Sequence, residues 1–152
     1  MAFNAAYDND IEERRIFEAR RLGGFLARLD SLDDQSRLYV LVWNRYPEAI
    51  RLLLDNHFVF QPFLDHQNNL TGSEDWEDRF ASAKRVAHAS LAKQDTGTVP
   101  SIVFQRLYTL RNQLIHGSAI WNSSVKRDQI RDTNGMLGDI VPSIIEILLD
   151  NA

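Results

Sequence analysis

Apolar side chains recur three and four residues apart along most of this chain, and this periodicity constrains the fold more than any other feature. Such spacing gathers apolar side chains on one face of a helix, whereas a half-buried strand requires strict alternation. We find no convincing alternating segment, so the sequence predicts an all-α protein. A chain of 152 residues has the size of one domain, which we place over 1–152 as a five-helix bundle. The predicted helices cover about residues 8–29, 31–54, 73–93, 100–117 and 125–149.

Prolines and glycines refine these boundaries. Pro47 predicts a kink or break inside the second helical region, because proline has no amide N–H to donate within a helix. Pro100 suits the first turn of the fourth helix, and Gly23-Gly24 predicts a bend or interruption in the first. The aromatic segment 56–73 predicts an ordered loop with, at most, a short extended or helical piece.

Composition excludes several classes of site. The chain has no cysteine, which rules out disulfide frameworks, thiolate metal sites and thiol nucleophiles. The four histidines include no pair spaced four residues apart, so we predict no metal site and no cofactor. The chain shows no basic leader followed by an apolar core, and no run of about 18 apolar residues. We therefore expect a cytoplasmic protein that does not associate with membranes.

Charge is distributed unevenly along the chain. The net charge of −4 argues against a broadly basic surface of the kind that binds nucleic acid nonspecifically. Residues 106–132 nevertheless hold five of the 17 Lys and Arg residues and two of the 21 acidic ones, a balance of +3. The five basic residues are Arg106, Arg111, Lys126, Arg127 and Arg131. A local binding site for an anion therefore remains compatible with the acidic chain.

The helix over 100–117 carries the main anomaly of the sequence. With Val103 at 0° and a rotation of about 100° per residue, its apolar side chains fall in an arc from roughly −20° to 120°. Those side chains are Phe104, Leu107, Leu110, Leu114 and Ile115. Arg111 falls at roughly 80°, inside the arc, while Asn112 and His116 share a flank. A guanidinium on the core-facing side of a helix is costly unless it is paired or opens into a cleft.

Two interpretations of this arginine stay open. Arg111 is either a functional residue or a structural one, paired with a buried carboxylate such as Glu48 or Asp65 or reaching the surface along its stem. A lone His116 is typical of a capping or surface histidine, although Gly117 suits the left-handed position that ends a helix. Residues five apart on a helix point roughly 140° apart. A direct Arg111–His116 partnership therefore requires an unwound terminus, the long arginine side chain or a second copy of the helix.

The same residues resemble a known signature. The run Arg111-Asn112-Gln113-Leu114-Ile115-His116, on the penultimate long helix of a small α-bundle, resembles the Arg-Asn-x-x-x-His motif of HEPN domains. The wider run from Leu107 to Gly117 is similar to the bacterial, Apea-like branch of that superfamily. The similarity continues through Trp121-Asn122-Ser123-Ser124-Val125 and Arg127-Asp128-Gln129.

The resemblance implies a helical bundle that dimerises so that two motif helices face each other across a cleft. Many HEPN proteins are metal-independent endoribonucleases, frequently in toxin–antitoxin, phage-defence or RNA-processing settings, and others are non-catalytic binding or dimerisation modules. RNA, a second copy of the chain and a protein antitoxin are therefore the partners that the resemblance implies.

A ribonuclease of this type cleaves RNA by attack of the substrate's own 2′-OH. His116 would act as general acid or base, because imidazole titrates near neutral pH. Arg111 would hold the phosphate and stabilise charge on its oxygens, and Asn112 would orient His116 or the phosphate. The expected RNA- and phosphate-binding residues are Trp121, Asn122, Lys126 and Arg127.

Two alternatives belong to other classes of protein. One is a non-catalytic helical dimer that recognises a nucleotide, RNA or a protein through the same cleft. The other is a scaffold in which Arg111 is purely structural. For the segment after the motif, the alternative is that Ser123 or Ser124 caps the last helix and that its basic residues, Arg131 above all, form a solvated face.

Overall fold

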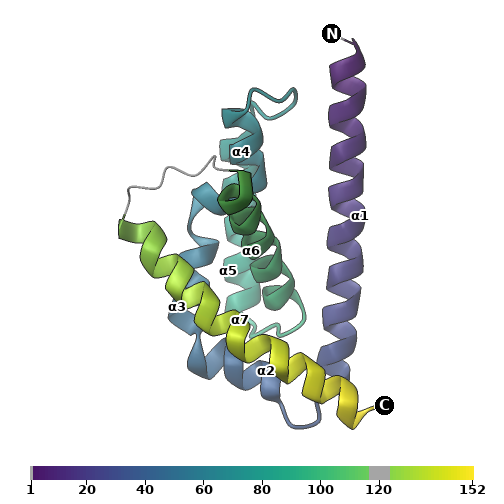
Figure 1. Cartoon of the computed structure of the whole chain (residues 1–152), viewed down its shortest axis with the longest axis vertical. Coiled ribbons are helices and arrows are strands. Elements are labelled where there is room, and N and C mark those ends of the chain that lie inside the picture. The colour runs from purple at the N-terminus through teal and green to yellow at the C-terminus, as the bar shows by residue number, and fades with distance from the viewer. Residues whose placement is uncertain (1, 117–123) are drawn as a thin grey trace.

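The computed structural model describes the backbone of residues 2–116 and 124–152, and the side chains of residues 10–113 and 127–152. Within these ranges every regular element is helical and no strand occurs, which confirms the all-α class (Figure 1). The elements are α1 (Ala2–Leu32), α2 (Arg37–Tyr39), the π-helix η1 (Val40–Arg45), α3 (Pro47–Leu54), the 3-10 helix η2 (His57–Val59), α4 (Gln61–Gln67), α5 (Trp76–Ala92), α6 (Thr98–His116) and α7 (Ser124–Asp150). None of the described helices combines the length and apolar content needed to cross a membrane.

The predicted helical regions all contain helices, but the structure divides the chain more finely than the predicted five. α1, α5, α6 and α7 occupy four of the regions. The predicted loop over 56–73 contains η2 and α4, so its short regular piece is helical. Gly23-Gly24 does not interrupt α1. A glycine costs a helix only about 1 kcal/mol relative to alanine, and Leu26 and Leu29, which follow the pair, are both buried.

The second predicted region is divided at two points. Before α2, Ser36 adopts a left-handed φ of 56°, and the Asp33 carboxylate accepts a hydrogen bond of 2.7 Å from the backbone N–H of Leu38. After η1, Tyr46 leaves the helical region with φ −120°, and Pro47 begins α3. Proline at this position removes no helical hydrogen bond, because the first N–H groups of a helix have no intrahelical partner. The break predicted at Pro47 is therefore confirmed.

The main core forms around α6, which packs against α1, α3, α5 and η2. Buried apolar side chains of η1, α3 and α7 complete this core. A second, smaller cluster joins the carboxyl end of α1 to α2 and the end of α7, and it consists of Leu26, Leu29, Leu38 and Ile147. The chain thus folds around the helix that carries the Arg-Asn-x-x-x-His motif.

The long helix α1 is anchored mainly at its carboxyl end. Leu26 and Leu29 are each only 1% exposed, whereas Ile16 and Phe17, two to three turns earlier, are 48% and 60% exposed. In Figure 1, α1 runs along one side of the bundle, with its carboxyl end near α7. Its amino-terminal part therefore borders the bundle without a continuous apolar contact.

This asymmetry predicts unequal effects of two substitutions in α1. Leu26→Ala should lower the free energy of unfolding by about 2–5 kcal/mol, because it leaves a cavity in a closed cluster. Ile16→Ala should change it by no more than about 0.5 kcal/mol, because the side chain is half exposed. Urea unfolding followed by circular dichroism measures both values. Equal losses in the two variants would contradict the described packing of α1.

Candidate functional site

The buried face of α6 differs from the predicted one. The residues Val99, Val103, Arg106, Leu110 and Gln113 are all buried and repeat at alternating intervals of four and three. With Pro100, Leu107 and Thr109, they occupy an arc from roughly −120° to 60° on the wheel centred on Val103. Arg111, at roughly 80°, lies outside this arc and is exposed. The prediction that Arg111 faces the core was therefore wrong.

The displaced face results from polar side chains that find partners inside the bundle. Gln113 is buried, and its Nε2 donates a hydrogen bond to the backbone carbonyl of Phe58 at η2. The Thr109 hydroxyl bonds the Gln105 carbonyl at 3.1 Å and the Gln61 side chain at 3.5 Å. Buried polar groups are tolerated when they are hydrogen-bonded. A helical wheel that counts only apolar residues therefore misplaces the buried face of α6, because it leaves out these polar positions.

Arg106 is the buried arginine of α6. Its side chain is 5% exposed, and its guanidinium carbon lies 4.5 Å from the ring centre of Phe60 and 5.9 Å from that of Phe80. No hydrogen bond or ion pair joins it to any other described residue, and its Nε is sealed from solvent without a partner. Burial lowers the pKa of the guanidinium to about 10, because the low-dielectric interior disfavours the charged form.

Arg111 opens instead onto a cleft between α1, α6 and α7. The cleft has a volume of about 500 Å³, and Arg15, Leu22, Tyr108 and Leu137 are among its lining residues. Within the described part of the chain, Arg111 forms no ion pair. The two carboxylates considered as its structural partners bind other arginines, Asp65 with Arg15 at 2.7 Å and Glu48 with Arg51 at 3.6 Å.

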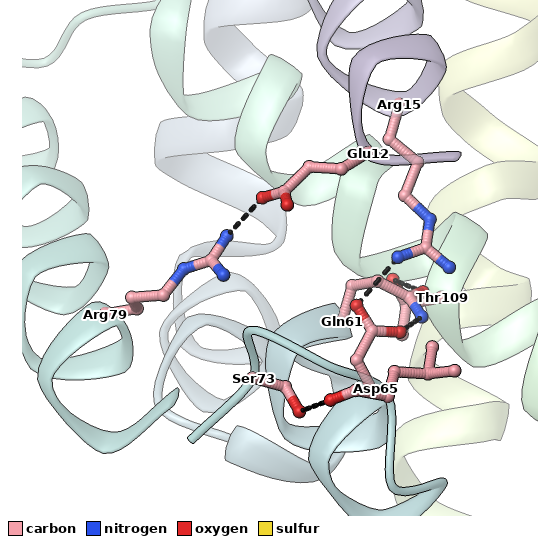
Figure 2. A network of polar contacts seen from close by, with 8 residues as sticks. Glu12, Arg15, Gln61, Asp65, Ser73, Arg79 and Thr109 are labelled. Atoms are coloured by element: carbon pink, nitrogen blue, oxygen red, sulfur yellow. Dashed lines mark hydrogen bonds and ion pairs between the residues drawn. The ribbon is translucent and has the colours of Figure 1, made fainter. Parts of the chain in front are cut away.

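A second cleft, of about 580 Å³, lies beside the first and contains Arg106 in its lining. The two share Arg15, Ala19, Gln61, Gln105 and Thr109 as lining residues. Figure 2 shows the polar contacts at this shared boundary, where Arg15 of α1 and Gln61 of α4 both bind Asp65. The Gln61–Asp65 hydrogen bond measures 2.9 Å. This network ties the amino-terminal part of α1 to α4.

The structure places only some of the other predicted site residues. Asn112 is half-buried on α6, next to Arg111, and Arg127 is exposed near the start of α7. α6 ends at His116, and α7 begins at Ser124. The side chains of His116 and Lys126, together with Gly117, Trp121, Asn122 and Ser123, lie outside the described residues. Arg131 is exposed and pairs with Asp128 at 2.8 Å, as expected for a solvated helix face.

The sequence analysis missed Arg106 as a distinctive residue and Tyr108 as a neighbour of Arg111 in its cleft. A signal for Arg106 was present, because it lies three residues after Val103 and four before Leu110. That spacing belongs to a core-facing stripe. Counting only apolar residues concealed this pattern.

Comparisons with known proteins add no family to these observations. No family model, curated protein or solved structure matches the chain. Among the described residues, no three His, Asp or Glu side chains are grouped so that they could hold a metal ion. The resemblance to HEPN domains therefore rests on the residues of the motif and of the segment after it.

The exposure of Arg111 predicts that this residue contributes little to stability. Arg111→Ala should change the free energy of unfolding by no more than about 0.5 kcal/mol. Leu110→Ala, at the adjacent buried position, should lower it by about 2–5 kcal/mol and serves as the comparison. Denaturant unfolding measures both. A loss of about 3 kcal/mol or more in Arg111→Ala would indicate a buried ion pair and a structural role.

Arg106 should have the opposite effect on stability. Its lowered pKa means that the charged guanidinium is less favourable in the folded state than in the unfolded state at every pH below about 10. Arg106→Met should therefore raise the free energy of unfolding at pH 7 by about 1–2 kcal/mol, since the rings of Phe60 and Phe80 offset part of the burial cost.

The stabilisation by Arg106→Met should be constant through neutral pH and shrink as the pH rises above about 10, where the buried arginine loses its proton. Chemical unfolding at several pH values, compared with the exposed variant Arg28→Met, measures this difference. Destabilisation by Arg106→Met at pH 7 would show that the cation has a stabilising partner.

Proposed function

We propose that this chain is a metal-independent endoribonuclease of HEPN type that acts as a homodimer. The observation that supports the proposal best is the position of Arg111. Its guanidinium is exposed at a cleft and forms no ion pair among the described residues, while both carboxylates suggested as its structural partners are bound to other arginines. It is therefore available to bind a phosphate through its two parallel N–H donors.

The proposed reaction is an internal transfer of the phosphoryl group. The ribose 2′-oxygen forms a bond to phosphorus as the bond from phosphorus to the 5′-oxygen breaks. A general base removes the 2′-OH proton, and a general acid gives a proton to the leaving 5′-oxygen. The products are a 2′,3′-cyclic phosphate and a free 5′-OH. His116 acts as acid or base, Arg111 stabilises charge on the phosphate oxygens, and Asn112 orients one of them.

Helical geometry supports a site shared by two chains. Positions 111 and 116 lie roughly 140° apart around α6, so one helix presents them on different faces. Two facing copies of α6 would bring Arg111 from one copy toward position 116 of the other. The pair would also supply two histidines to one cleft, one for each proton transfer. A single motif helix offers only one histidine.

The concentration of basic residues in the segment 106–132 fits contact with RNA through a few cations. Arg127 is exposed at the start of α7, which follows α6 in the chain. With Lys126, Trp121 and Asn122 it forms the proposed RNA-binding rim. Because the whole chain carries −4, binding would depend on these few cations and weaken steeply with salt. A ribonuclease acting on cellular RNA in the cytoplasm must be restrained, so the proposal includes a toxin or phage-defence role with a protein antitoxin.

A specific observation favours a second candidate, a non-catalytic binding module. The cleft beside Arg111 is lined by the apolar side chains of Leu22, Phe104, Leu107 and Leu137. Pockets with largely apolar walls and a few polar groups are typical of small-molecule or peptide side-chain binding. In that case, Arg111 would orient an anionic group of the ligand and no bond would be cleaved.

The decisive experiment compares cleavage of labelled RNA in EDTA by the wild type, His116→Ala and Arg111→Ala. We expect cleavage to 2′,3′-cyclic phosphate ends by the wild type, and a rate at least about 100-fold lower in His116→Ala. His88→Ala, which changes an exposed histidine on α5, is the matched control and should retain full activity. Equal rates in the wild type and His116→Ala would refute the proposal.

Two further outcomes distinguish the candidates. RNA binding without cleavage, kept in His116→Ala and lost in Arg111→Ala, would identify the binding module. Adding an excess of His116→Ala to the wild type tests the shared site, because each mixed dimer would hold one histidine where the proposed cleft uses two. An activity per wild-type chain that does not fall would contradict a site built from two chains.

A further inference from the structure

The second cleft contains a buried cation that has no ion-pair or hydrogen-bond partner among the described residues. Arg106 is nine-tenths buried or more at 5% exposure, and it lines a cleft of about 580 Å³ bounded by α1, α4, α5 and α6. Phe60 and Phe80 lie against its guanidinium, and no other described residue donates to it, accepts from it or pairs with it. A buried charge without a partner is rare in folded proteins, because its desolvation is not repaid.

Two of the three carboxylates that line this cleft are paired with other arginines. Asp65 pairs with Arg15 at 2.7 Å, and Glu12 pairs with Arg79 at 3.1 Å (Figure 2). These two ion pairs connect α1 to α4 and to α5. Asp78, the remaining acidic residue in the lining, is on α5 and forms no ion pair with Arg106. The lining holds three arginines and three carboxylates, but none of the described carboxylates forms an ion pair with Arg106.

We propose that this cleft binds a small molecule through a phosphate or carboxylate group held by Arg106. A guanidinium provides parallel N–H donors that match the oxygens of either group, and contact with an anion would supply the missing counter-charge. The Gln61 amide, which has a second N–H besides the one bonded to Asp65, and the Ser82 hydroxyl line the same cleft and offer further donors. The anionic group would bind the part of the guanidinium that lines the cleft, next to the sealed Nε.

The dimensions and walls of the cleft indicate the rest of the ligand. Its volume lies within the range of roughly 300–1,000 Å³ that is typical of small-molecule sites. Ile16, Phe60, Pro62 and Ala83 line it, so an apolar body would lie beside the anionic group. This cleft adjoins that of the proposed ribonuclease centre and shares lining residues with it, but its cation differs, because Arg106 lines only this cleft and Arg111 only the other.

The test measures binding of inorganic phosphate and of acetate to the purified protein. Sodium chloride at equal ionic strength controls for general salt effects. We expect at least one of the two anions to raise the melting temperature of the wild type along a saturable curve. Arg106→Met should weaken that binding at least tenfold, while Arg28→Met, an exposed arginine on α1, should bind as the wild type does. Phosphate and acetate together distinguish the two possible head groups.

A second measurement does not depend on the variant. The Nε–H of Arg106 is sealed and unpartnered, so its NMR signal should shift during the anion titration of the wild type with the same dissociation constant. The proposal is overturned if neither anion binds saturably, or if Arg106→Met binds them as tightly as the wild type. Loss of RNA binding in Arg106→Met, with no binding of either free anion, would overturn it in favour of an RNA phosphate contact.

Discussion

The structure depends on the burial of one face of α6, and that face is only partly apolar. Valine and leucine positions along it form the main core with α3 and α7, while Arg106, Thr109 and Gln113 face the segment that contains η2 and α4. Each of these polar side chains contacts that segment: Thr109 bonds Gln61, Gln113 bonds the Phe58 carbonyl, and Arg106 lies against the Phe60 ring. The placement of η2 and α4 is thereby coupled to the rotation of α6 about its own axis.

This rotation decides what each arginine of α6 can do. Arg106 and Arg111 are five residues apart, so a helix directs them to different sides. With the core face centred between Val103 and Gln113, Arg106 lies beneath Phe60 and Phe80, and Arg111 points to the outer cleft. Two cations on one helix thus face two environments, one of low dielectric and one solvated. Only the solvated cation suits the proposed contact with RNA.

The amino-terminal part of α1 forms a wall of both clefts without filling either of them. It forms the ion pairs of Arg15 and Glu12, and its packing against the apolar core begins at Leu22. Partly exposed ion pairs contribute little stability, typically no more than about 1 kcal/mol. This part of α1 therefore packs loosely against α6 and leaves the two clefts open. Open clefts of this size are what binding sites require.

The sequence by itself determined the helical class, the positions of the long helices, the break at Pro47 and the placement of the motif on α6. These features follow from local periodicity and from the backbone chemistry of proline, which act over a few residues. Only the tertiary structure decided that Arg106, and not Arg111, is buried, and that Asp65 forms its ion pair with Arg15. A helical wheel cannot supply this, because whether a polar side chain lies inside depends on the partners that distant segments bring to it.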